Sequence, residues 1–436
     1  MKYSSTKNKN QMTDLKTAVT MGMPADGGLY MPEDIPQITL PVLSSFRNMP
    51  INDIAKVILK KYVANEVTQS DFEEIVDDAL NFDTPLHTIT DNISVLELFH
   101  GPTLAFKDVG ARFMSRLLSK LIKNDKQEIN IVVATSGDTG SAVASGFYNV
   151  EGIRVFILYP SKKISDIQKK QITTYGQNIY PLEIKGNFDD CQRIVKQLLT
   201  DKQIKRDLTI TTANSINIAR LLPQLVYYFK AVSQLQDFEK LYVSVPSGNF
   251  GNLCAGIIAK KMGLKIYKFI AATNINDVVP QYLMTGEYLP KPSKSTLSNA
   301  MDVGDPSNFE RIMDLYHHDY EMIKNDIAGL AFSDEQTKIK IKEVFQKYQY
   351  LLDPHGAVGF LAMEETLEIN SHKQGIHGIS LETAHPAKFL EHMEKIINGT
   401  IEIPSRLKKR LSLREGFEIL PNEYEKIKGY FLDVCH

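Results

Sequence analysis

The sequence has few cysteines, and their number and spacing argue against a disulfide-stabilised domain and against a zinc-binding domain. Only three cysteines occur among 436 residues, Cys191, Cys254 and Cys435, and no two of them have the CxxC spacing. An odd number of widely separated cysteines indicates neither a disulfide framework nor a zinc site. Such cysteine usage is typical of a reducing compartment, so we expect a cytoplasmic protein.

Excess charge and long apolar runs are also missing. The 50 Lys and Arg residues nearly balance the 52 Asp and Glu residues, for a formal net charge of −2, so nothing favours a nucleic-acid partner. No segment approaches the ~18 consecutive apolar residues of a membrane helix, and residues 1–10 lack the apolar stretch of a signal peptide. The histidine pairs 317–318 and 372–377 are predicted to be solvated, and no metal site is expected.

What the sequence does contain is a chain of alternating strand and helix patterns. Between residues 129 and 273 short apolar runs alternate with helical patterns, which is typical of βαβ units around a mostly parallel sheet. Residues 1–90 differ: a loop-rich stretch at 22–32 precedes helical patterns at 51–63 and 72–80, which predicts an N-terminal accessory domain. The expected strands are 93–99, 129–134, 153–159, 180–184, 208–211, 241–245 and 266–272.

Lys107 is the candidate for covalent chemistry. It lies between the strand-like segment 93–99 and a helical pattern that runs from Phe113 to Ile122, with Asp108 as the expected N-cap. Burial and the positive end of a helix dipole both lower the pKa of an amine from its ordinary value of about 10.4. Such a lysine is nucleophilic at neutral pH and can form a Schiff base. Taken alone, the pattern favours a solvated lysine, one of many in a chain with 50 Lys and Arg residues.

A glycine-containing loop is the strongest companion to Lys107. The segment Gly248, Asn249, Phe250, Gly251 and Asn252 follows the strand 241–245 and opens a helical pattern that Gly263 is expected to cap. Glycines let a backbone approach a ligand closely, and the N–H groups of a helix N-terminus bind anions. We therefore expect a phosphate here, although a plain strand-to-helix turn would have the same pattern.

Two further loops follow predicted strands and carry groups suited to anions. The first contains Ser136, Gly137, Asp138 and Thr139, whose hydroxyls and backbone N–H groups can hold a carboxylate, although helix capping would also explain them. The second contains Asn214, Ser215 and Arg220. Because a guanidinium pairs bidentately with phosphate oxygens, this loop suits a phosphate monoester.

Pro223 follows Arg220 within a helical pattern and is expected to interrupt that helix unless it lies in the first turn.

Five segments together resemble the threonine synthase family. These are residues 100–108, 135–140, 214–220, 246–252 and 381–389, in that order along the chain. The resemblance runs over almost the whole sequence and includes the early segment 27–30. It implies the α/β fold of the tryptophan synthase β subunit, called fold type II of the pyridoxal-phosphate enzymes. Two parallel-sheet domains and an N-terminal accessory domain are expected.

The resemblance also implies roles for individual residues. Lys107 would bind pyridoxal 5'-phosphate as a Schiff base, the 248–252 loop would hold the cofactor phosphate, and Thr383 would face the pyridine nitrogen. Ser136, Gly137 and Thr139 would hold the substrate carboxylate, while Asn214, Ser215 and Arg220 would hold the substrate phosphate. Asp138, placed with the substrate-binding residues, stands where many relatives of this fold carry an asparagine near the cofactor phenolate oxygen.

The implied reaction converts O-phospho-L-homoserine and water to L-threonine and phosphate by γ-elimination and β-hydration, the last step of threonine biosynthesis. The expected domains are 1–90 (accessory), 91–118 with 225–436 (cofactor-binding) and 119–224 (smaller and mobile), in a monomer or homodimer. The lysine and glycine loop are shared with other lyases of the fold, so a serine or threonine dehydratase-like enzyme is an alternative. A non-catalytic binding protein that keeps the scaffold is another.

Overall fold

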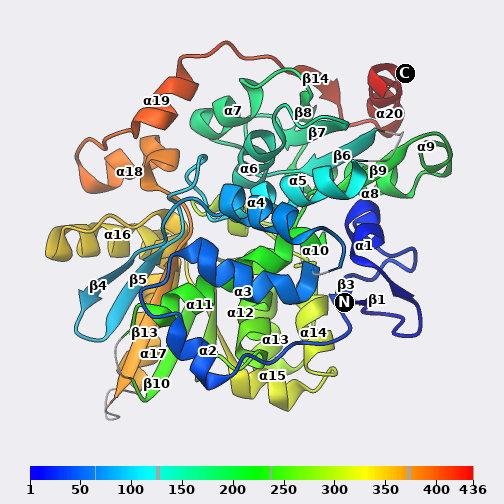
Figure 1. The fold of residues 1–436 in the computed structure, drawn as a ribbon. Helices are drawn as coiled ribbons and strands as arrows, with labels where there is room; N and C mark the ends of the chain where they lie inside the picture. Colours follow the sequence, from blue (N-terminus) through cyan, green and yellow to red (C-terminus); the bar gives the residue numbers. More distant parts are fainter. Residues whose placement is uncertain (64, 124–127, 236–237, 371–374, 436) are drawn as a thin grey trace.

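Two large sheets and one small sheet organise the protein (Figure 1). The computed structural model describes residues 1–63, 65–123, 128–235, 238–370 and 375–435. In the view of Figure 1 the five-stranded sheet lies in the upper part of the molecule and the six-stranded sheet in the lower part. Both sheets are mainly parallel, as the alternation of strands and helices predicted.

The six-stranded sheet has the order β12-β11-β10-β13-β5-β4. All neighbours are parallel except the edge strand β4, which is antiparallel to β5. The central strands β10 and β13 are almost entirely buried, because helices cover both faces of a parallel sheet. Its strands are β4 (Leu86–Thr90), β5 (Ile93–Glu97), β10 (Lys240–Pro246), β11 (Lys268–Thr273), β12 (Ile327–Ala331) and β13 (Ile376–Glu382).

The five-stranded sheet is wholly parallel and has the order β14-β8-β7-β6-β9. It contains β6 (Ile129–Ala134), β7 (Ile153–Pro160), β8 (Ile179–Lys185), β9 (Thr209–Thr212) and β14 (Glu418–Pro421). Every strand expected from the apolar runs is present, with ends that differ by no more than about two residues. Strand β14 was not expected. It brings part of the C-terminal tail to this sheet, although the predicted division assigns 225–436 to the other domain.

The N-terminal segment forms the small sheet and a group of helices. Strands β1 (Tyr3–Ser5), β2 (Met12–Thr13) and β3 (Tyr30–Pro32) pair antiparallel. Helices α1 (Leu15–Met21), α2 (Leu40–Ser45), α3 (Ile51–Val63) and α4 (Gln69–Ala79) follow. Helix α3 has the predicted bounds. Helix α4 begins earlier than predicted because the Thr68 hydroxyl caps it by accepting from the Asp71 N–H at 3.1 Å.

The remaining helices cover the two large sheets and connect them. Around the five-stranded sheet lie α5 (Lys107–Ile122), α6 (Asp138–Phe147), α7 (Asp166–Thr173), α8 (Phe188–Thr200), α9 (Lys202–Asp207) and α20 (Tyr424–Cys435). The others are α10 (Ile218–Leu221), η1 (Leu222–Gln224), α11 (Leu225–Ser233), α12 (Gly251–Lys261), α13 (Val278–Thr285), η2 (Asn299–Met301), α14 (Phe309–Leu315), α15 (Tyr320–Asp326), α16 (Asp334–Tyr348), α17 (Pro354–Ile369), η3 (Pro386–Phe389), α18 (Leu390–Ile397) and α19 (Ser405–Leu411).

Pro223 does interrupt the helical pattern after Arg220. It lies in the 3-10 turn η1, between α10 and α11, where the missing N–H and fixed φ of proline are tolerated. The short helix α10 therefore carries Arg220 separately from the longer α11. Gly110 on α5 permits the close approach of α10, because a Cβ there would lie 2.8 Å from the Arg220 carbonyl oxygen.

Two predicted helix caps are wrong. Helix α5 begins at Lys107, so Asp108 is inside the helix, where its carboxylate accepts from the Thr103 N–H at 2.9 Å and the Thr103 hydroxyl at 2.6 Å. Thr103, in the loop before the helix, supplies both donors, so the Asp108 carboxylate is bound there and does not cap the helix. The cap of α12 is Met262, and Gly263 lies one residue beyond it with φ +110°.

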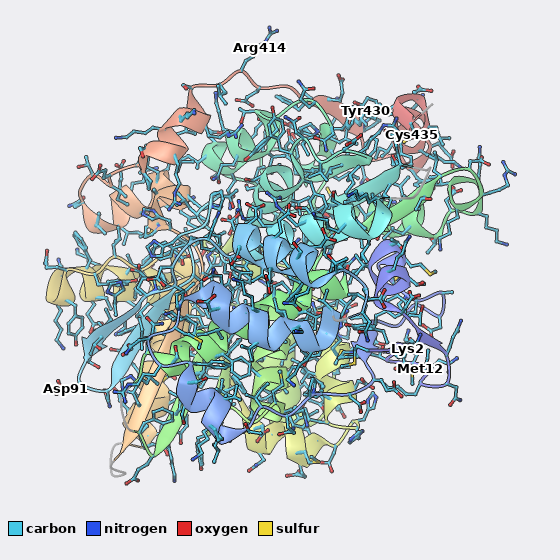
Figure 2. All side chains as sticks on the ribbon, viewed as in Figure 1. Lys2, Met12, Asp91, Arg414, Tyr430 and Cys435 are labelled. Carbon is cyan, nitrogen blue, oxygen red and sulfur yellow. The ribbon has the colours of Figure 1, made fainter. Side chains whose placement is uncertain are left out.

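The C-terminal tail spans both large sheets. From α18 and α19 it runs along the outer side of the molecule to β14 and α20 (Figure 1). Figure 2 shows Arg414 at the outer rim of this stretch, and Tyr430 and Cys435 on α20. Along the way Arg410 lies over the Tyr175 ring at 3.8 Å, and the Gly416 N–H donates to the Thr173 carbonyl at 2.7 Å. The tail is therefore attached to the helix layer of the five-stranded sheet.

Candidate active site

Lys107 is positioned by backbone pairing with the end of β13. The Phe106 N–H donates to the Thr383 carbonyl at 2.9 Å, and Ala105 forms a β-bridge with Ala384. This pairing fixes the loop that precedes α5, so Lys107 and Thr383 line the same cavity. The Tyr227 hydroxyl donates to the Phe106 carbonyl at 2.5 Å and holds the loop from the other side.

The glycine loop lines the same cavity. Phe250 adopts the left-handed conformation with φ +60° and places Gly251 as the first residue of α12. This helix start follows strand β10, and its first N–H groups have no partner within the helix, which is the arrangement that binds phosphate. Asn252 accepts from the Tyr228 hydroxyl at 2.8 Å, while its buried Nδ2 has no hydrogen-bond partner among the described residues. That amide is a donor available to a ligand.

Gly248 is the glycine of this loop that cannot carry a side chain. A Cβ at Gly248 would lie 2.4 Å from the Ala300 carbonyl oxygen and 2.9 Å from the Met301 Cα, both backbone atoms, whereas a Cβ at Gly251 would make only ordinary contacts at 3.4 Å. The loop and the η2 segment are therefore packed backbone against backbone.

We expect Gly248→Ala to weaken cofactor binding about 10- to 100-fold, because the added methyl group must displace the loop or η2. Titration of the cofactor-free variant with pyridoxal phosphate, followed by visible absorbance, measures the change. Gly429→Ala is the control, since a Cβ there meets nothing within 4 Å. Wild-type affinity in the Gly248 variant would contradict the expected packing.

Asn214 and Ser215 lie between the ends of β6 and the glycine loop. The Asn214 side chain donates to the Ala134 carbonyl at 2.7 Å and accepts from the Ala134 N–H at 3.1 Å. The Ser215 hydroxyl accepts from Asn308 at 3.1 Å. Both residues line the cavity, and Asn214 at the same time fixes the end of β6.

Arg220 also lines the cavity and is almost completely buried. Its Nη1 donates to the Ala213 carbonyl, and its Nε has no hydrogen-bond partner among the described residues. Burial lowers the pKa of Arg220 to about 10, with Asp108 and Tyr227 acting in the opposite sense. Nowhere in the described part of the chain does Arg220 form an ion pair. A buried guanidinium without a carboxylate partner is suited to an anionic ligand.

Only part of the segment 136–139 lines the cavity. Ser136 and Thr139 line the cavity, whereas Gly137 and Asp138 do not. Gly137 has φ +132° and its N–H donates to the Thr135 hydroxyl at 2.9 Å. Asp138 is buried and pairs with Lys388 at 2.9 Å. Of the site residues expected from sequence, only these two fall outside the lining.

Sequence reasoning missed several residues of the cavity wall. His355 is buried at the start of α17, where its Nδ1 lies 2.5 Å from the Asp353 carboxylate and its Nε2 accepts from the Ala300 N–H at 3.2 Å. The adjacent Asp353 and Pro354 are a helix-start signal that could have located this residue. Other lining residues lie in the recognised segments but were given no role: Phe106, Thr135, Pro246 and Ser247. Lining residues outside those segments are Ala134, Phe188, Gln224, Ala300, Met301 and Val303.

The environment of Lys107 favours the uncharged amine. Burial is the main cause that lowers its pKa to about 8, and the positive charges of Lys388 and Arg220 act in the same direction. Asp138 opposes them. A buried amine with a pKa near neutrality is the nucleophile that the sequence suggested.

In cofactor-free protein, we expect the rate of pyridoxal phosphate capture to rise with pH through a midpoint near 8. The sign follows from the lowered pKa, because the amine loses its proton above that value and only the neutral amine attacks an aldehyde. Stopped-flow absorbance after mixing with the cofactor measures this rate. A midpoint close to the ordinary lysine value would contradict the electrostatic environment described above.

Comparison with known proteins covers the whole chain. Three family models match in succession: threonine synthase N terminus at residues 2–80, pyridoxal-phosphate dependent enzyme at 81–376, and threonine synthase C-terminal at 356–430. The threonine synthase of Escherichia coli is 41% identical over 435 residues, covering 99% of this chain and 100% of that protein.

The chain belongs to the threonine synthase family.

Other relatives and solved structures agree with this assignment. The threonine synthase of Buchnera aphidicola (from Acyrthosiphon pisum) is 42% identical over 440 residues, covering 99% of this chain and all of that one. The crystal structure of the Escherichia coli enzyme matches with a TM-score of 0.93 and 40% identity, covering 100% of both chains. A threonine synthase from Brucella melitensis, described as bound to PLP, matches with a TM-score of 0.91 and 34% identity, covering 99% of this chain and 98% of that one.

More distant matches share the fold alone. A threonine deaminase from Solanum lycopersicum has a TM-score of 0.54 at 13% identity and covers 76% of this chain. The expected fold, that of the pyridoxal-phosphate enzymes of fold type II, is confirmed. The chain is a pyridoxal-phosphate-dependent lyase of the threonine synthase family.

The residues of the cavity fit this cofactor. Lys107 offers an amine of lowered pKa, the start of α12 offers backbone N–H groups, and Asn252 offers a buried amide donor without a partner among the described residues. Gly248 keeps the loop close against η2. Together they provide an amine for an aldehyde and donors for a phosphate in one cavity.

The described residues contain neither a candidate metal-binding cluster nor a membrane-spanning helix. In that part of the chain no group of three or more His, Cys, Asp or Glu side chains could hold a metal ion. His372 lies outside the described residues, and the His377 ring contacts the Ser94 hydroxyl at 3.0 Å. None of the described helices is both long and apolar enough to span a bilayer.

Proposed function

We propose that this enzyme converts O-phospho-L-homoserine and water to L-threonine and inorganic phosphate, with pyridoxal 5'-phosphate held at Lys107. The observation that carries the proposal is that one cavity is lined both by the 248–252 loop and by Asn214, Ser215 and Arg220, two sets of groups that are each suited to an anion. A cofactor and a substrate that each carry a phosphate need two such places.

The proposed binding roles follow from where the groups lie. The cofactor phosphate would be held by the loop of Gly248, Asn249, Phe250, Gly251 and Asn252. Thr383 would face the ring nitrogen, and its hydroxyl can hydrogen-bond to that nitrogen when the nitrogen carries no proton. The substrate carboxylate would be held by Ser136 and Thr139 together with the backbone at Gly137 and Asp138. Arg220, with Asn214 and Ser215, would take the phosphate of the substrate.

Lys107 is proposed to move protons during the reaction. When bound, pyridoxal phosphate supplies an electron sink for negative charge at carbon atoms next to the substrate amine. Because its pKa is about 8, the Lys107 amine can accept a proton from substrate carbon and return it near neutral pH. Arg220 would stabilise the negative charge that grows on the departing phosphate, since its charge is buried and already oriented.

Closure of a smaller unit over the cavity is part of the proposal. Residues 119–224 would move relative to the cofactor-binding part (91–118 with 225–436) and the accessory domain (1–90). Strand β14 is expected to move with the smaller unit because it pairs with β8. Such closure would exclude water until the hydration step.

We further propose a cytoplasmic enzyme that acts as a monomer or homodimer on a small molecule, without a nucleic-acid partner. Its three free cysteines suit a reducing compartment, and its net charge of −2 gives no attraction to nucleic acid. Light scattering of the purified protein gives the oligomeric state.

An assay with three substrates tests the reaction. We expect inorganic phosphate and L-threonine in equal amounts from O-phospho-L-homoserine, and no comparable turnover of L-serine or L-threonine to a keto acid. Keto acid formation without phosphate release would favour the dehydratase-like alternative. Bound cofactor with no turnover of any of the three would favour the non-catalytic alternative.

A further inference from the structure

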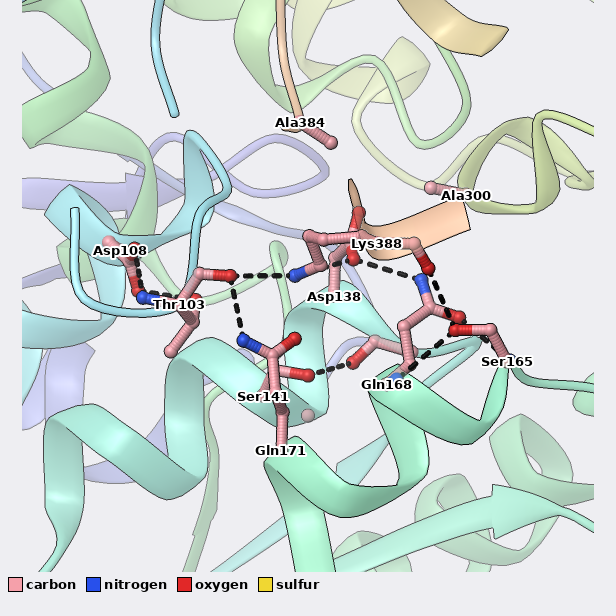
Figure 3. Close-up of polar contacts among 12 residues, drawn as sticks. Thr103, Asp108, Asp138, Ser141, Ser165, Gln168, Gln171, Ala300, Ala384 and Lys388 are labelled. Carbon is pink, nitrogen blue, oxygen red and sulfur yellow. Dashed lines mark hydrogen bonds and ion pairs between the residues drawn. The ribbon is translucent and has the colours of Figure 1, made fainter. Parts of the chain in front are cut away.

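Lys388 is a fully buried lysine whose ammonium has two acceptors. It belongs to the short helix η3, and its Nζ lies 2.9 Å from the Asp138 carboxylate and 2.9 Å from the Thr103 carbonyl oxygen. Figure 3 shows the ammonium between these two residues. A charge without access to water must be paired and hydrogen-bonded, and Lys388 meets this requirement.

Asp138 is the carboxylate that Lys388 neutralises. Its Oδ1 also accepts from the Gln168 amide at 2.9 Å, which ties the first residue of α6 to α7. Burial by itself would raise the pKa of Asp138. Lys388, then Lys107, then His355 outweigh that effect and hold the pKa well below its ordinary value. The carboxylate is therefore charged near the Lys107 amine.

Three charged groups act on Lys107, each from a different element. Asp138 on α6 favours the ammonium, whereas Lys388 on η3 and Arg220 on α10 favour the neutral amine. Without Lys388, the carboxylate of Asp138 would lose the largest positive influence on it and would act more strongly on Lys107. Lys388 therefore offsets the effect of the buried carboxylate and, with burial and Arg220, helps to keep the pKa of Lys107 lowered.

Lys388 also holds the loop that leads to Lys107. The Thr103 carbonyl accepts from both Lys388 and the Gln171 amide at 3.0 Å. The N–H and hydroxyl of Thr103 donate to Asp108, the residue after Lys107. The same ammonium therefore contacts the carboxylate that acts on Lys107 and the loop that carries it.

We propose that Lys388 is a positioning residue for Lys107, which neutralises the Asp138 carboxylate and holds the Thr103 loop in place. This proposal rests on the proposed role of Lys107 as the cofactor-binding lysine, but not on the identity of the substrate. In this proposal Asp138 does not line the cavity but affects it through its ion pair with Lys388.

Opposite shifts in two single variants test the proposal. In the cofactor-loaded enzyme, we expect Lys388→Met to raise the midpoint pH of the visible absorbance change by about 1 unit, because the bare carboxylate stabilises positive charge at the Lys107 nitrogen. Asp138→Asn should lower that midpoint by about 1 unit, since Lys388 is then unpaired. The double variant should return close to the wild-type value, because both charges are gone.

Lys230→Met is the matched control, since Lys230 is another buried lysine that donates to a carbonyl, that of Met49 at 3.0 Å. Its midpoint should equal that of the wild type. Shifts of the same sign in both single variants, or a double variant that keeps a full shift, would overturn the proposal.

If Lys388→Met does not fold, Asp138→Asn and the double variant still decide, because only the first should be shifted. The absorbance titration needs no turnover. An enzyme that fails to release phosphate from O-phospho-L-homoserine would therefore refute the proposed reaction without affecting this result.

Discussion

Replacing Lys107 with alanine is expected to lower phosphate release from O-phospho-L-homoserine at least about 10³-fold. The substitution removes the amine that holds the cofactor and moves protons, and no other lysine lines the described cavity. The visible absorbance of the bound cofactor as a Schiff base should be lost at the same time. Steady-state phosphate release and absorbance spectra of the purified variant measure the two effects.

Lys123→Ala is the matched control because Lys123 is exposed at the other end of the same helix, α5. This variant should retain wild-type activity and absorbance. Circular dichroism should show that both variants are folded. If Lys107→Ala retained wild-type turnover, another group would have to carry the proton transfers, and the proposed mechanism would be wrong.

For Arg220→Lys we expect a loss of about 10² in kcat/KM for O-phospho-L-homoserine. Lysine keeps the positive charge but not the planar fork, so it cannot pair bidentately with the phosphate that leaves. Cofactor affinity should be unchanged, because the 248–252 loop, not Arg220, is proposed to hold the cofactor phosphate. Phosphate release at several substrate concentrations, together with cofactor titration, separates the two properties.

Arg47→Lys is the corresponding control, since Arg47 is exposed in the N-terminal segment. Its kinetics should match those of the wild type. A variant at Arg220 that loses cofactor and retains substrate affinity would place the cofactor phosphate, not the substrate phosphate, beside this arginine.

Most secondary structure could be predicted from sequence because its causes are local. Apolar runs between helical patterns located β6, β7 and β10 to within about two residues, and helix α3 has the predicted bounds. Pro223 was recognised as a break in the helix, since the restriction on proline is a property of the residue itself. The Asp108 cap was wrong because the donors of Thr103 come from a loop whose path depends on its pairing with β13.

Strand β14 is a second case in which local pattern was insufficient. The four residues Glu418–Pro421 are exposed or half-buried, and they do not form an apolar run from which a strand could be predicted. The strand exists because its backbone pairs with β8 at the edge of the five-stranded sheet. Such pairing at a sheet edge depends on the path of the preceding chain, which is set by α18, α19 and their contacts.

The sequence by itself determined the candidate lysine, the glycine loop and the segments suited to anions, because each depends on residue types at short spacing within one strand-loop-helix unit. Only the tertiary structure decided which of these units meet. Backbone pairing places Thr383 beside Phe106, and an ion pair joins the buried side chains of Lys388 and Asp138. These contacts join residues far apart in the chain, and the pKa of Lys107 depends on them because charges act through space rather than along the sequence.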